Sequence, residues 1–124
     1  MKKEPVRFGI VGLKRGLCAL SLLEEDSVLI TAVCDINPAT LAAAKETIQS
    51  ELAAHGKTQE VCYLDSYEEL LRADVDAVYI ANYATEHVPL AIQALEAGKH
   101  VISEIPTVDT LEEARALKAA VTAH

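Results

Sequence analysis

The chain has 124 residues, a hydrophobic content of 51%, an aromatic content of only 4% and a formal net charge of −8. This length fits one domain with a buried core, which must be built mainly from Ala, Leu, Val and Ile. The negative charge, without a basic stripe to neutralise phosphates, argues against nucleic acid as a partner. No apolar run has membrane-spanning length and the N-terminus lacks the apolar stretch of a signal peptide, so we expect no membrane partner.

The three cysteines, Cys18, Cys34 and Cys62, are odd in number and show no CxxC spacing. This pattern is typical of reduced, buried thiols and predicts a cytoplasmic protein. No group of Cys, His and Asp has metal-ligand spacing, so we predict no metal.

Apolar strands alternate with amphipathic helices along the first half of the chain. Turn and capping residues mark where the helices begin, because Asn before Pro and Ser before Glu are typical helix starts. The predicted elements are a strand at 6–12, a helix at 16–25 with Leu17, Leu20 and Leu23 on one face, a strand at 28–34, a helix from Asn37-Pro38 to about Gly56, a strand at 61–64 and a short helix at 66–71.

The second half continues the alternation. Its predicted elements are a strand at 77–81, a helix around 88–95 closed by Gly98, a strand at 100–103 and a helix at 110–122, capped by Asp109 or Thr110, with Leu111, Ala114, Leu117 and Val121 facing inward. Five strands alternating with helices imply right-handed crossovers and an α/β fold. We therefore predict one domain over residues 1–124, a doubly wound parallel sheet of strand order 3-2-1-4-5 between two helical layers.

The turn after the first strand, Gly12-Leu13-Lys14-Arg15-Gly16, resembles a dinucleotide-binding turn with changes in its glycines. An apolar strand, a glycine turn and a helix place backbone N–H groups and a positive dipole end at one point, which suits a pyrophosphate. Lys14 stands where the G-x-G-x-x-G fingerprint has its second glycine, and Leu17 stands at its third. The alternative is a simple strand–helix turn.

Asp35, at the end of the second strand, favours the nucleotide interpretation over a simple turn. A carboxylate at this position accepts hydrogen bonds from ribose hydroxyls and repels a 2′-phosphate, so NAD is favoured over NADP. Lys14 and Arg15 weaken that preference, because either can pair with a phosphate.

Polar residues also follow the fourth and fifth strands, at the sheet edge where ligands of open α/β sheets bind. Asn82 and Thr85 can bond a ribose or cap the next helix, and capping is the commoner use. For His87, at a helix start, a structural hydrogen-bonding role is favoured over catalysis. Glu104 fits equally well beside a nicotinamide or as a solvated loop carboxylate.

The segments FGIVGL, AVCDINP, VDAVYIAN, EHVPLAIQALEAGKHVISEIP and TLEEARAL together resemble the N-terminal domain of the glucose–fructose oxidoreductase/inositol dehydrogenase (Gfo/Idh/MocA) family. The resemblance covers nearly the whole chain. It implies a Rossmann domain that binds NAD(P), an α/β substrate domain after it, and oxidation or reduction of sugars, cyclitols or related polyols. The cofactor-binding residues that we predict with it are Gly12, Leu13, Lys14, Arg15, Asp35, Ile36, Asn82, Tyr83, His87 and Glu104.

Two departures from the family pattern limit the expected activity. Ile105 replaces the lysine of the family's Glu-Lys-Pro motif, which contributes to proton transfer, and isoleucine can neither accept nor donate a proton. The expected substrate domain is absent from these 124 residues, so we predict no catalytic residue and no turnover from this chain alone. The open edge of the fifth strand leads us to expect a homo-oligomer.

Two alternatives to a polyol or sugar dehydrogenase stay open. One is the cofactor domain of an enzyme like the NAD-dependent glycoside hydrolases of the same superfamily, some of which also lack that lysine. The other is a non-catalytic nucleotide-binding or interaction module.

Overall fold

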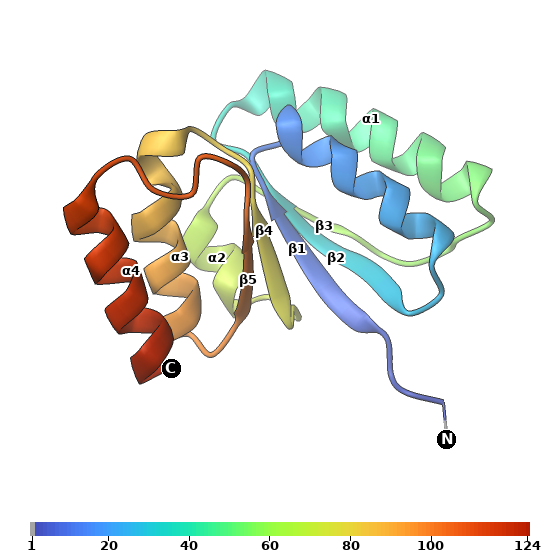
Figure 1. Cartoon of the computed structure of the whole chain (residues 1–124). Helices are drawn as coiled ribbons and strands as arrows, with labels where there is room; N and C mark the ends of the chain where they lie inside the picture. The colour runs from blue at the N-terminus through green and yellow to red at the C-terminus, as the bar shows by residue number, and fades with distance from the viewer. Residues whose placement is uncertain (1) are drawn as a thin grey trace.

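The computed structural model describes residues 2–124 and contains one five-stranded, all-parallel sheet in the order β3-β2-β1-β4-β5. The strands are β1 (Val6–Val11), β2 (Val28–Cys34), β3 (Cys62–Leu64), β4 (Ala77–Ile80) and β5 (His100–Ser103). Helices cover both faces, as Figure 1 shows. The predicted doubly wound α/β fold and its strand order are therefore confirmed.

The core lies in two aliphatic clusters, one on each face of the sheet. Successive residues of a strand point to opposite faces, so Ile10 joins the cluster beneath η1 (Arg15–Glu24) and α1 (Pro38–Ala54), whereas Val11 joins the other. The second cluster packs against α2 (Tyr67–Arg72) and α3 (His87–Glu96). Each fully buried Val, Leu or Ile stabilises the fold by about 1.5–3 kcal/mol.

Three α-helices begin at side-chain caps that the sequence predicted. Asn37 Oδ1 accepts the N–H groups of Ala39 and Thr40 at 3.0 and 3.1 Å, and Ser66 Oγ accepts that of Glu69 at 3.4 Å. For α4 (Leu111–Ala123), Thr110 is the cap, and its Oγ1 accepts the Glu113 N–H at 3.1 Å. Each cap pairs a backbone donor that the helix itself leaves without a partner.

The first helix differs from the prediction, because η1 is a 3-10 helix. Its leucines recur every three residues, at Leu17, Leu20 and Leu23, and three residues is the repeat of a 3-10 helix. Leu20 and Leu23 are buried and Leu17 packs partly against the same cluster. The leucine face predicted from the sequence is thus correct, although the helix type is not.

Several predicted burials are wrong. In α4, Leu111 is 68% and Val121 is 59% exposed, because α4 lies beyond the edge strand and packs mainly on α3. Figure 1 shows α4 on the outer side of α3. Of the cysteines only Cys34 is buried, whereas Cys18 of η1 and Cys62 of the edge strand β3 are exposed. Among residues 2–124, no helix is long and apolar enough to cross a membrane.

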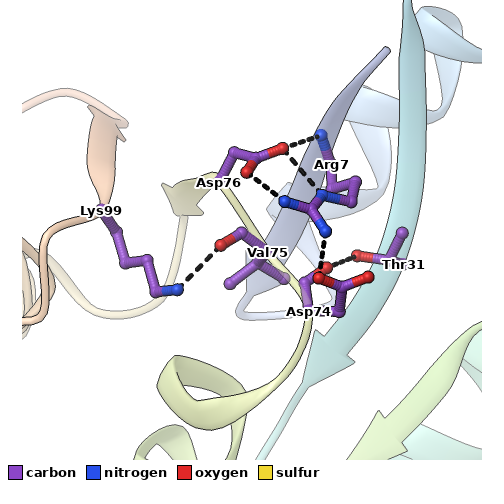
Figure 2. Close-up of polar contacts among 6 residues, drawn as sticks. All are labelled: Arg7, Thr31, Asp74, Val75, Asp76 and Lys99. Carbon is purple, nitrogen blue, oxygen red and sulfur yellow. Dashed lines mark hydrogen bonds and ion pairs between the residues drawn. The ribbon is translucent and has the colours of Figure 1, made fainter. Parts of the chain in front are cut away.

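At the amino-terminal edge of the sheet, a polar cluster ties four strands together (Figure 2). Arg7 of β1 bonds both carboxylate oxygens of Asp76, through Nε at 2.9 Å and Nη2 at 2.6 Å, and also pairs with Asp74. Thr31 of β2 donates to the Asp74 carbonyl at 2.7 Å, and Lys99, before β5, donates to the Val75 carbonyl at 2.9 Å. This edge is therefore used for holding the strands, which leaves the opposite edge for a ligand.

This cluster predicts a loss of stability in acid. Hydrogen bonds from the Arg7 side chain and backbone hold the pKa of Asp76 well below its usual range. The carboxylate's contribution to stability is therefore complete above about pH 5 and falls as the pH drops through its unfolded value of about 3.9 toward the folded value. Urea unfolding should show Asp76→Asn less stable than wild type at pH 7, with the difference shrinking steadily below pH 4.

The matched control for this prediction is Glu68→Gln, which removes the exposed i,i+4 pair with Arg72. Exposed pairs of this kind contribute little, so this variant should unfold like wild type at both pH values. A pH-independent deficit in Asp76→Asn would show that its carboxylate does not stabilise the fold through its charge.

Candidate functional site

A cavity of about 610 Å³ opens at the carboxyl ends of β1, β2 and β4. Ligands of doubly wound sheets bind at this edge, where the strand order reverses between β1 and β4. The cavity is lined by Val11, Gly12, Lys14, Arg15, Cys34, Asp35, Ile36, Asn37, Thr40, Tyr67, Ala81, Asn82, Tyr83, Glu86, Pro89 and Leu90. A second cavity of about 420 Å³, between α3, β5 and α4, contains none of the predicted site residues.

Gly12 allows the end of β1 to pass close to the end of β4. Its φ is +86°, a left-handed conformation that disfavours side chains, and a Cβ there would lie 2.6 Å from the Asn82 backbone nitrogen. Its own N–H donates to the Cys34 carbonyl at 3.0 Å. Only glycine fits this turn, which brings three strand ends to the cavity.

Gly16, rather than residue 17, takes the role of the third glycine of the G-x-G-x-x-G fingerprint. A Cβ on Gly16 would lie 2.6 Å from Cγ2 of Ile10, so its absence lets η1 lie directly on β1. Close helix–strand packing is the task of the fingerprint's third glycine. The turn is one residue shorter than the fingerprint, and the Gly12–Gly16 spacing was the signal in the sequence that we missed.

Asp35 is held in place by two backbone donors. Its Oδ2 accepts the Leu13 N–H and its Oδ1 accepts the Asn37 N–H, both at 2.9 Å. These bonds join the glycine turn to the end of β2 and orient the carboxylate, which borders the cavity. A carboxylate has about four lone-pair sites, so two stay free for further donors.

Asn82 carries an unsatisfied buried acceptor beside the cavity. Its Nδ2 donates to Glu86 Oε2 at 2.6 Å, while its Oδ1 is buried and finds no donor among residues 2–124. A buried acceptor without a partner is costly unless a ligand or water supplies a donor. Tyr83 and Ile36, about three-quarters exposed, add apolar surface to the lining.

The structure brings seven of the ten predicted cofactor residues to the cavity and places Leu13, His87 and Glu104 outside its lining. The Leu13 side chain is 2% exposed and belongs to the core, so this residue reaches the turn only through its backbone. His87, also 2% exposed, lies with Nδ1 and Nε2 each 2.9 Å from a carbonyl oxygen, those of Pro106 and Asn82. It therefore joins the segment after β5 to the segment after β4.

Glu104 lies next to the cavity and contacts one of its lining residues. Its Oε2 accepts the Tyr79 hydroxyl at 2.5 Å and Arg15 Nε at 3.1 Å, and its Oε1 accepts the Ile105 N–H at 3.2 Å. These three donors, the Tyr79 hydroxyl first, lower the pKa of Glu104 to about 2. The carboxylate is thus ionised at any ordinary pH. The Ile105 side chain is 80% exposed.

Sequence comparison decides the family. Residues 6–124 match the Gfo/Idh/MocA oxidoreductase family, described as having an NAD-binding Rossmann fold. The chain belongs to this family. It is an NAD-binding Rossmann domain, as the sequence predicted.

Relatives of known name fall into two groups. The chain is 35% identical over 123 residues to glycosyl hydrolase family 109 protein 1 of Bacteroides fragilis, covering 94% of this chain and 25% of that protein. Its fold superposes on scyllo-inositol dehydrogenase of Lactobacillus casei, solved with NAD(H) and scyllo-inositol, with a TM-score of 0.79, 27% identity, and coverage of 98% of this chain and 34% of that one. For a 3-ketoreductase of Actinomadura kijaniata, solved with TDP-benzene and NADP, the TM-score is 0.78 and the identity 28%, with coverage of 97% of this chain and 36% of that one.

The residues around the cavity fit a dinucleotide of the kind that this Gfo/Idh/MocA domain binds. The missing Cβ of Gly12 lets the ends of β1 and β4 meet at the cavity, and the buried Asn82 Oδ1 has no donor among residues 2–124, so it can accept one such as a ribose hydroxyl. Asp35 adds a second oriented acceptor. The chain spans about a quarter of the length of the curated relatives it matches.

Proposed function

We propose that this domain prefers NAD(H) over NADP(H) and binds it in the cavity between the ends of β1, β2 and β4. The oriented Asp35 carboxylate is the observation that carries the proposal. A carboxylate that accepts both hydroxyls of the adenosine ribose opposes a 2′-phosphate through like-charge repulsion. Asn82 Oδ1 would accept a further hydroxyl, and Tyr83 and Ile36 would flank the ligand.

The proposed role of the whole protein is oxidation or reduction of a sugar, cyclitol or related polyol. When bound, NAD would supply the hydride acceptor for oxidation of a substrate carbon. The residues that bind the substrate would lie outside residues 1–124, because the curated relatives are about four times as long. Ile105, which stands at the position of the family's lysine, cannot act as a base. The scyllo-inositol dehydrogenase likeness supports a polyol substrate.

A second candidate is the cofactor domain of a glycoside hydrolase. It is favoured by the 35% identity to a family 109 glycosyl hydrolase and by Ile105 in place of a proton-transferring lysine. A full-length parent that cleaves a glycoside without net formation of NADH would favour this candidate over a dehydrogenase. If neither activity exists, a binding module remains.

Calorimetric titration of the chain with NADH and NADPH tests the proposed function. We expect one site per chain and tighter binding of NADH. No heat with either cofactor would overturn cofactor binding, and tighter NADPH binding would overturn the preference assigned to Asp35. In both cases, a thermal melt of the same sample shows whether the protein was folded.

The isolated chain should not oxidise sugars or polyols even when it binds NAD. Hydride transfer needs a base and an oriented substrate, and the exposed Ile105 provides neither. Absorbance at the NADH band should therefore stay at the no-protein rate with a panel of polyols, and Ile105→Lys should not raise it. Turnover that Gly12→Ala abolishes would show a complete active site in this chain.

We further propose that the isolated domain is cytoplasmic and self-associates through β5. Among residues 2–124 this strand pairs with β4 alone, and its Ile102 is 49% exposed. An unpaired, apolar strand edge is a template for another chain. Light scattering at high micromolar concentration should give a mass above that of one chain, and a monomer would contradict this interface.

A further inference from the structure

The Arg15 guanidinium at the cavity is fixed from the side by another element of the fold. Arg15 begins η1 and lines the cavity, while Glu104 follows β5, 89 positions later in the sequence. Only Nε of Arg15 is bonded to Glu104, and its two Nη groups have no hydrogen-bond partner among residues 2–124. These Nη groups form the planar fork that binds phosphate oxygens in pairs.

Glu104 is itself held by Tyr79 of β4. The same Oε2 that accepts Arg15 Nε accepts the Tyr79 hydroxyl at 2.5 Å, and the Glu104 side chain is only 20% exposed. Burial raises the pKa of Tyr79, so its hydroxyl keeps its proton and donates. The Tyr79 hydroxyl donates its hydrogen bond to Glu104, so its oxygen is free to accept one. Cys18 can donate it, because its Sγ lies 3.4 Å from the Tyr79 hydroxyl oxygen.

The ion pair between Arg15 and Glu104 adds little to the stability of the fold, because the Arg15 side chain is 67% exposed. What the pair does achieve is to remove side-chain freedom from Arg15 before any ligand arrives, which lowers the entropic cost of binding. Lys14, the other cation of the turn, is exposed and has no hydrogen bond within the described chain. The two neighbouring cations therefore differ in preorganisation.

We propose that Tyr79 and Glu104 are positioning residues that hold Arg15 at the Gly12 turn, and that Arg15 supplies a contact to the diphosphate of the bound dinucleotide. This inference rests on the proposed binding of NAD(H). It explains how a turn that carries Lys14 in place of a glycine can still bind a diphosphate: a side-chain fork replaces part of the close backbone approach. It also gives Glu104 a role without contact to the nicotinamide.

A double-mutant cycle tests the proposal through the dissociation constants of NADH and ADP-ribose. Arg15→Ala should weaken both ligands about 10- to 100-fold, because charged hydrogen bonds to the diphosphate are lost. Tyr79→Phe, which keeps the ring, should weaken both about 3- to 10-fold in the wild-type background and have no effect in the Arg15→Ala background. Lys14→Ala, which removes the neighbouring cation that no other side chain of residues 2–124 holds, should weaken binding less than Arg15→Ala does.

Any other outcome of this double-mutant cycle would overturn one specific part of the proposal. Equal losses from Tyr79→Phe in both backgrounds would make Tyr79 merely structural, and losses as large in Lys14→Ala would leave only general electrostatics. A loss for NADH but not for ADP-ribose would place Arg15 away from the diphosphate. Failure of the wild-type chain to bind either ligand would instead remove the proposed function. Arg15→Gln replaces Arg15→Ala if the latter does not unfold cooperatively.

Discussion

Gly12→Ala is expected to weaken NADH binding by at least about 100-fold and to lower the free energy of unfolding by about 3 kcal/mol or more. The new Cβ would lie 2.6–2.7 Å from the Asn82 nitrogen, the Ala81 carbonyl carbon and the Asn82 Cα. These are backbone atoms and cannot rotate away, so β1 and β4 must move apart where the cavity opens. Fluorescence titration with NADH and urea unfolding measure the two effects.

Gly98→Ala is the matched control for this substitution. Gly98 has a similar positive φ, +76°, but nothing lies within 4 Å of its added Cβ. It should therefore show the backbone strain alone, about 1–2 kcal/mol, with unchanged NADH affinity. If Gly12→Ala binds NADH as tightly as Gly98→Ala does, the close approach of the strand ends does not shape the site.

Asp35→Ala is expected to lower the preference for NADH over NADPH by about fivefold or more. Repulsion between a carboxylate and a 2′-phosphate at close range is worth at least about 1 kcal/mol, even in water. The substitution also removes the acceptor of the Leu13 and Asn37 N–H groups, so both cofactors should bind more weakly. The ratio of the two dissociation constants cancels this shared loss and reports what the carboxylate does at the ribose itself, namely its hydrogen bonds to the hydroxyls of NADH and its repulsion of the 2′-phosphate of NADPH.

Asp65→Ala provides the control for this ratio. Asp65 follows β3 as Asp35 follows β2, and it is exposed and does not line the cavity. Its removal changes the net charge equally without changing the site, so the ratio should stay at the wild-type value. A ratio that falls equally in both variants would mean that the net charge, rather than Asp35, sets the cofactor preference.

The sequence alone determined the parts of the structure that depend on local chemistry and on period. Caps such as Asn37 and Ser66 are specified by side chains that reach backbone donors two or three residues away, so the helix starts were predictable. Because apolar strands that alternate with helices are compatible with few sheet topologies, the parallel sheet and its strand order could be predicted. Gly12 and Asp35, which line the cavity, were predicted because the roles proposed for them need particular residue types at strand ends.

Contacts between residues far apart in the chain were decided only by the tertiary structure. Nothing near Glu104 in the sequence indicates that it bonds Tyr79 and Arg15, because those contacts arise from β5 lying beside β4 and from the place where η1 begins. The burial of His87 and the exposure of Leu111 and Val121 have the same origin. A periodic pattern predicts which residues share a face of a helix, but burial depends on whether another element covers that face, and the elements packed around a position are set by the whole fold.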